Sequence, residues 1–149
     1  MTRVVTGLLA ALIAGGLLLS ACGTESLASA MSGWVSQSQF HQNLPTLTKD
    51  VRHSATALEN SKSSAHVLHL VCGVLVTDTE AANASLPTPD AQSTRLRSRA
   101  YTDIGAGANI CYGAGSSTSR RNSALARLRK GLNELTEGVQ RVDVAQGTN

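Results

Sequence analysis

The chain has 149 residues, of which 42% are hydrophobic, 15% are charged and only 3% are aromatic. This length and balance favour one globular domain over a disordered protein, with a core filled by Leu, Val and Ala. The 13 Lys and Arg against 10 Asp and Glu make the chain only weakly basic, which excludes the charge footprint of a nucleic-acid-binding protein.

Residues 1–21 have the three-part organisation of a secretory signal peptide. Arg3 precedes an uncharged apolar run from Val4 to Leu19, and small residues follow before Cys22. The run is short for a membrane-spanning helix, which needs about 20 apolar residues. We therefore predict a signal peptide that is cleaved, and no transmembrane segment.

The sequence Leu19-Ser20-Ala21-Cys22 resembles the lipobox of bacterial lipoproteins. The resemblance implies that Cys22 is diacylated and becomes the first residue of the mature protein, because two acyl chains give stable anchoring. The expected location is the outer face of the cytoplasmic membrane, with the membrane as partner through Cys22. The A-x-A site Ala28-Ser29-Ala30 offers an alternative, which is secretion after cleavage at Ala30.

Residues 22–33 are small and polar and predict a flexible tether before a folded domain at 34–146. In this domain apolar residues recur at steps of three and four, which predicts helices. We expect four, at about 34–58, 64–85, 89–112 and 119–142. Pro45 either kinks the first helix or starts a new one, and the valine-rich centre of the second helix also suits a strand. Short connections predict an all-α, up-and-down four-helix bundle.

Cys72 and Cys111 remain as an even pair once the signal peptide is removed. In an exported chain such a pair predicts one disulfide between the second and third helices. Two free thiols or a metal pair are the alternatives, but no His or Asp cluster nearby completes a metal site. A tight turn near residue 88 would bring Cys72 level with about residue 104 and not with Cys111. We therefore predict an extended connection between these helices.

Two clusters of arginine are the candidate contacts with an anionic surface. Arg95, Arg97 and Arg99 begin the third helix, at the end where the tether enters, and face anionic lipid headgroups in this interpretation. Arg120 and Arg121 begin the fourth helix at the opposite end, where an acidic envelope protein or a cell-wall polyanion is the expected partner. The alternative for each cluster is a solvated helix face.

No motif indicates catalysis, a metal or a cofactor. His66 and His69 share a helix face, but no acid or C-x-x-C-H motif accompanies them. The glycines of 105–110 depart from the dinucleotide-binding pattern, and no serine lies in a nucleophile elbow. We therefore expect a protein that is not an enzyme and holds no metal or cofactor.

The lipobox, Trp34, the two cysteines, "LPTPD" (86–90) and "AYTDIGAGANICY" (100–112) together resemble small actinobacterial envelope lipoproteins of unknown function. The resemblance implies a signal peptide and a four-helix domain with a disulfide between helices two and three. It implies no activity. We expect a non-enzymatic, lipid-anchored envelope protein that acts as a partner- or ligand-binding helical module.

The alternative function is a carrier of a small apolar molecule or a metal in the bundle interior. A sizeable cavity would favour the carrier and a filled core would favour the binding module. The side chains that decide between them are Leu68, Leu75, Ile104 and Leu132.

Overall fold

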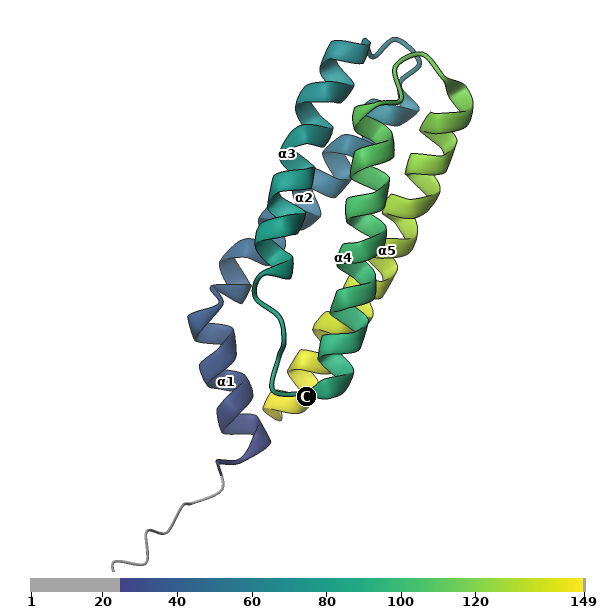
Figure 1. Ribbon diagram of the computed structural model, residues 1–149. Helices are drawn as coiled ribbons and strands as arrows, with labels where there is room; N and C mark the ends of the chain where they lie inside the picture. The colour runs from purple at the N-terminus through teal and green to yellow at the C-terminus, as the bar shows by residue number, and fades with distance from the viewer. Residues whose placement is uncertain (1–24, 149) are drawn as a thin grey trace, which may run out of the picture.

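The computed structural model describes residues 25–148, and in this range the chain forms five α-helices and no strand (Figure 1). The predicted all-helical class is confirmed, with one helix more than the four expected. The predicted signal peptide and Cys22 lie outside the described residues. The helices are α1 (Leu27–Gln37), α2 (Phe40–Glu59), α3 (Ala65–Asn83), α4 (Ala91–Tyr112) and α5 (Thr118–Gln146).

The segment that the sequence predicts to be a flexible tether is helical from Leu27 onward, so that prediction is wrong for 27–33. The hydroxyl of Ser26 caps α1 by accepting a hydrogen bond from the backbone N–H of Ser29. Met31 and Val35 then bury their side chains in a small apolar cluster with residues at the far end of α5. The composition of residues 27–33 is that of a linker, but α1 is stabilised because its apolar side chains are buried against α5.

The first predicted helix is in fact divided into α1 and α2. Gln39 separates them and adopts a left-handed backbone conformation with φ of 52°. Such a conformation cannot continue a right-handed helix. Pro45 then lies inside α2, which continues to Glu59, so the second helix begins before the proline and not at it.

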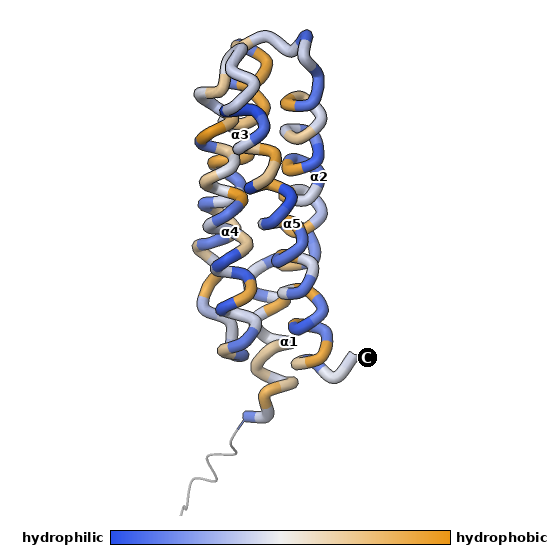
Figure 2. The backbone as a smooth tube through the Cα atoms, turned by 90° about the vertical axis from the view of Figure 1, so that its right-hand side faces the viewer, coloured by the Kyte–Doolittle hydropathy of each residue, from blue (hydrophilic) through white to orange (hydrophobic). Residues whose placement is uncertain are grey.

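α2, α3, α4 and α5 run side by side, and α1 lies at one end of them (Figure 1). Hydrophobic and hydrophilic residues alternate along each helix (Figure 2), as expected when one face packs inward. The main core is formed by side chains of all four helices α2, α3, α4 and α5. A smaller apolar cluster is formed by α1, the start of α2 and the end of α5.

The disulfide Cys72–Cys111 links α3 to α4 inside the main core, as predicted. Both cysteines have no exposed surface. Cys111 lies much further from the start of α4 than Cys72 lies from the end of α3. The chain between Asn83 and Ala91 therefore runs extended beside α4, and Figure 1 shows this path. The predicted extended connection is confirmed.

Glycine lets α4 and α5 approach closely. A Cβ atom on Gly131 would lie 2.7 Å from Cγ1 and 2.9 Å from the backbone nitrogen of Ile104. A Cβ atom on Gly107 would lie 2.8 Å from Leu128, and one on Gly138 would lie 2.8 Å from Cγ of Arg97. These contacts offset the cost of glycine in a helix, which is about 1 kcal/mol each.

Candidate functional site

Arg97 on α4 is buried, with only 3% of its surface exposed. The aliphatic part of its side chain packs against Gly138 of α5, where any larger residue would displace it. Arginine is almost never fully buried without a partner for its charge. The surroundings of Arg97 are therefore the first place to look for a function.

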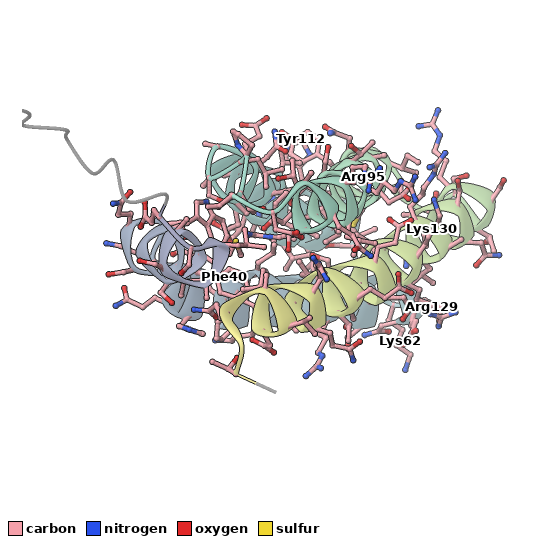
Figure 3. The ribbon with its side chains drawn as sticks, turned by 90° about the horizontal axis from the view of Figure 1, so that it is seen from below. Phe40, Lys62, Arg95, Tyr112, Arg129 and Lys130 are labelled. Carbon is pink, nitrogen blue, oxygen red and sulfur yellow. A yellow bond between two sulfur atoms is a disulfide. The ribbon has the colours of Figure 1, made fainter. Side chains whose placement is uncertain are left out.

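Three aromatic rings surround the guanidinium of Arg97. Its central carbon lies 4.6 Å from the ring centre of Trp34, 4.7 Å from that of Phe40 and 5.3 Å from that of Tyr101. These distances allow cation–π attraction, which stabilises a desolvated cation by about 2 kcal/mol per favourable ring. Phe40 lies where α1 and α2 meet (Figure 3), so three different helices supply the rings.

The guanidinium has few hydrogen-bond partners. Its Nη2 donates to the hydroxyl oxygen of Tyr101, whereas its Nε and Nη1 have no partner among the described residues. No carboxylate in this part of the chain forms a salt bridge with it. Burial lowers the pKa of Arg97, but arginine stays protonated in proteins, so the site holds a cation with two unused donors.

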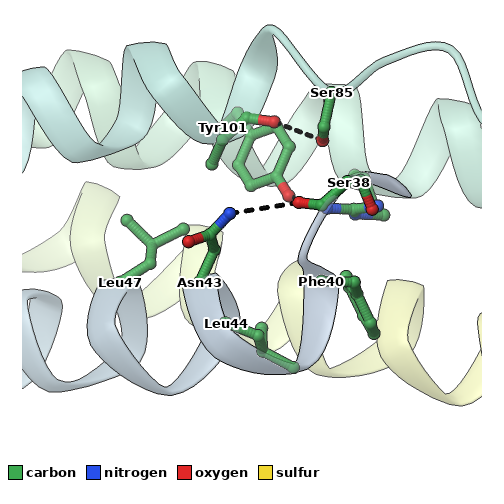
Figure 4. Close-up of a pocket in the computed structure, with 9 residues that line it drawn as sticks. Ser38, Phe40, Asn43, Leu44, Leu47, Ser85 and Tyr101 are labelled. Atoms are coloured by element: carbon green, nitrogen blue, oxygen red, sulfur yellow. Dashed lines mark hydrogen bonds between the residues drawn. The ribbon is translucent and has the colours of Figure 1, made fainter. Parts of the chain in front are cut away.

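Arg97 is one of the residues that line a small cavity, and Figure 4 shows the other side chains around it. Its volume is about 20 Å³, which is enough for roughly one water molecule. Apolar side chains from α2 form one wall, and the opposite side carries Ser85 and Tyr101. The amide of Asn43 donates to the Ser38 carbonyl at this wall. We call the guanidinium, the three rings and this cavity the Arg97 site.

α1 covers one side of the Arg97 site. The indole N–H of Trp34 donates to the carbonyl oxygen of Ser85 over 2.9 Å and so fastens α1 to the α3–α4 connection. The left-handed residue Gln39 turns the chain so that Trp34 and Phe40 both face the guanidinium. The site is therefore closed by the helix nearest the N-terminal end of the described chain.

The predicted arginine surface is corrected by the structure. Arg95, Arg99 and Arg120 are exposed, but Arg97 and Arg121 are buried and cannot contact an anionic surface. The reason is helical geometry, because residues two apart point in different directions whereas residues four apart share a face. Arg95 and Arg99 therefore stay outside when Arg97 faces inward with Ala100.

Arg121 has a structural role at the opposite end of the molecule. Its guanidinium donates to the carbonyl oxygens of Asn60, Ser63 and Gly115 at 2.7 to 2.9 Å. These bonds tie the α2–α3 connection to the α4–α5 connection. With its donors engaged, Arg121 needs no ligand.

The structure places the histidine pair on the surface of α3. His66 and His69 are both exposed, and His69 stacks against Tyr112 with ring centres 3.5 Å apart. Tyr112 lies at the outer edge of the molecule (Figure 3). No group of three or more metal-ligating side chains occurs in residues 25–148.

Asp90 fixes the start of α4 next to the site. It accepts a capping hydrogen bond from the Ser93 backbone N–H and a two-fold hydrogen bond from Arg141 of α5 at 2.8 and 2.9 Å. The bonds from Arg141, followed by those from Ser93, hold the pKa of Asp90 well below its usual range.

We expect Asp90→Asn to reduce the sensitivity of the fold to acid. Because the pKa of Asp90 is lower in the folded state, its stabilising effect is present above the unfolded-state pKa near 3.9 and is lost as pH falls below it. Asparagine keeps the helix cap but loses the ion pair. Urea unfolding at neutral pH and below pH 3 should show a smaller acid-induced loss for the variant. An equal loss in both proteins would show that Asp90 does not couple folding to pH.

The chain matches no protein-family model, no curated protein and no solved structure. Over the described residues no helix combines the length and hydropathy that crossing a membrane needs.

Proposed function

We propose that the mature chain is a lipid-anchored protein of the cell envelope that binds a small ligand and catalyses no reaction. In this proposal residues 1–21 are a cleaved signal peptide, and Cys22 holds the protein on the outer face of the cytoplasmic membrane. Helices α2–α5 act as an up-and-down four-helix bundle that carries the ligand site at the end nearest the anchor.

The observation that carries the ligand-binding proposal is the guanidinium of Arg97, which is buried and has two unused donors. A buried charge without a partner costs several kcal/mol, and an apolar residue of similar volume is often more stable in its place. The three aromatic rings and the Tyr101 oxygen offset part of this cost, but they leave Nε and Nη1 of Arg97 without an acceptor. A ligand that accepts hydrogen bonds would supply one.

The packing of the interior supports a binding module over a carrier of an apolar molecule. Leu68, Leu75 and Ile104 have no exposed surface and belong to one core cluster, against which Leu132 packs. These are the side chains that an internal carrier cavity would have to separate.

The position of α1 supports lipidation at Cys22 over cleavage at Ala30. Cleavage there would remove the capping residue Ser26 and the first four residues of α1, 27–30. The remainder of that helix carries Trp34, which closes the Arg97 site. A mature chain that begins at Cys22 keeps α1 whole.

We expect radiolabelled palmitate to enter the wild-type protein and to be absent from Cys22→Ala. The thiol of Cys22 is the proposed attachment point, and the other two cysteines are buried in a disulfide. Mass spectrometry of the purified mature protein should find lipidated Cys22 at the N-terminus. Equal labelling of both proteins, or a mature chain that starts at Met31, would contradict the anchor.

Ligand binding is tested with Trp34, which is the only tryptophan of the chain. Its ring lies against the Arg97 guanidinium, so its fluorescence reports directly on the site. We expect a panel of small anions and small neutral hydrogen-bond acceptors to include a compound that gives a saturable change in the wild type and none in Arg97→Met. A panel without any such compound would count against the proposed function.

A further inference from the structure

Arg97 differs from every other buried charge in the described residues. Asp90 pairs with Arg141, Asp103 pairs with two basic residues of α5, and Arg121 donates to three carbonyl groups. In each case the protein itself supplies the opposite charge or the acceptor. At Arg97 it supplies one phenol oxygen.

The Arg97 site has more donors than acceptors. Nε and Nη1 of Arg97 are unused, and the Tyr101 hydroxyl, which accepts from Nη2, has no acceptor for its own hydrogen among the described residues. Burial raises the pKa of Tyr101, so this phenol keeps its hydrogen at neutral pH. A group that only accepts hydrogen bonds therefore suits a site with this excess of donors.

Three carbonyl oxygens at the cavity each accept a hydrogen bond. The carbonyl oxygen of Ser38 accepts from Asn43, that of Ala82 accepts from the Ser85 hydroxyl, and that of Ser85 accepts from Trp34. None of these carbonyl groups accepts a hydrogen bond from Arg97. Because Nε and Nη1 of Arg97 have no acceptor among the described residues, we look for one in a bound group.

Cavity size and charge together limit what can bind. A volume of about 20 Å³ suits an occupant of one to a few atoms and is far too small for a sugar, a nucleotide or a phospholipid headgroup. One uncompensated positive charge calls for one negative charge, because the site is desolvated and an unbalanced charge is costly there.

We propose that the Arg97 site binds a small monovalent anion, of the size of chloride or formate, held by the Arg97 guanidinium and the Tyr101 hydroxyl. This inference rests on the proposed ligand-binding function and names the class of its ligand. The bound anion also links α4 to α1, because Trp34 and Phe40 pack on the same guanidinium. Binding therefore strengthens the attachment of α1 to the rest of the protein.

The test is a titration of the mature protein in non-ionic detergent at constant ionic strength. Sodium gluconate, whose anion is too large for the cavity, is replaced stepwise by sodium chloride or sodium formate. We expect a saturable change in Trp34 fluorescence and a rise in the melting temperature, since a ligand that binds only the folded state stabilises it. Sodium sulfate measures the general salt effect, which acts on every variant.

Two variants distinguish a loss of anion binding from a loss of folding. Arg97→Met keeps the volume and removes the charge, and we expect it to lose the saturable response. Tyr101→Phe keeps the ring and removes one hydrogen bond to a charged group, which should weaken apparent affinity by about tenfold or more. Circular dichroism of both variants checks that they fold.

Each outcome of the titration has a definite meaning. A chloride or formate response that is equal in wild type and Arg97→Met would overturn the anion site, as would no response in the wild type. If the anions fail but another compound of the panel binds through Arg97, the anion inference is wrong and the ligand-binding function stands. If no compound of any class binds, both are wrong.

Discussion

Removal of the disulfide by the double substitution Cys72→Ala and Cys111→Ala is expected to lower the free energy of unfolding by about 4 kcal/mol. The bond closes a loop with a sequence separation of 39, and its loss returns that loop's freedom to the unfolded chain. Urea unfolding followed by circular dichroism measures the difference between the oxidised wild type and the variant.

The control for this experiment is the wild type unfolded under strong reducing conditions. There the bond is absent from the unfolded state, so the wild type should approach the stability of the double variant. A double variant as stable as the oxidised wild type would show that packing alone holds α3 to α4.

The second large effect is expected at Gly131, where α4 and α5 are closest. An alanine there would place its Cβ within 3.0 Å of the Ile104 nitrogen and the Ala100 carbonyl oxygen. These are backbone atoms that cannot rotate away, so the two helices must separate. We expect Gly131→Ala to lower the free energy of unfolding by about 2–3 kcal/mol, although alanine is the better helix former.

Gly33→Ala is the matched control, because it makes the same substitution within a helix. Nothing lies within 4 Å of the position of the added Cβ, so only helix propensity acts and the change should be neutral or stabilising by up to about 1 kcal/mol. If both substitutions changed stability in the same direction and by the same amount, close approach at Gly131 would not explain its glycine.

The long helices and the disulfide could be predicted from sequence because local patterns encode them. Apolar steps of three and four identify the inward faces of α2 to α5, and the two cysteines outside the predicted signal peptide leave one pairing. α1 could not be predicted in this way. Its small polar residues resemble a linker, and its stability depends on Val142 and Ala145 at the other end of the sequence.

The Arg97 site was missed for a related reason. Arginine at every second position from 95 to 99 suggests an exposed basic stripe, although residues three or four apart share a helix face and residues two apart do not. Ala100, Ile104 and Ala108 lie on the buried face of α4. Arg97 comes three residues before Ala100 and therefore lies on the same face. That signal was present in the sequence. The positions of Trp34 and Phe40 over the guanidinium follow from the break at Gln39, which no local pattern shows.

The central claim is that the buried guanidinium of Arg97 has its partner in a bound anion. A crystal of the protein grown in sodium bromide tests this most directly, since bromide stands in for chloride and is located by its anomalous scattering. The account predicts an anomalous peak in the cavity between Arg97 and Tyr101 in the wild type and no peak there in Arg97→Met. A cavity without bromide in the wild type, in a crystal that binds bromide elsewhere, would contradict it.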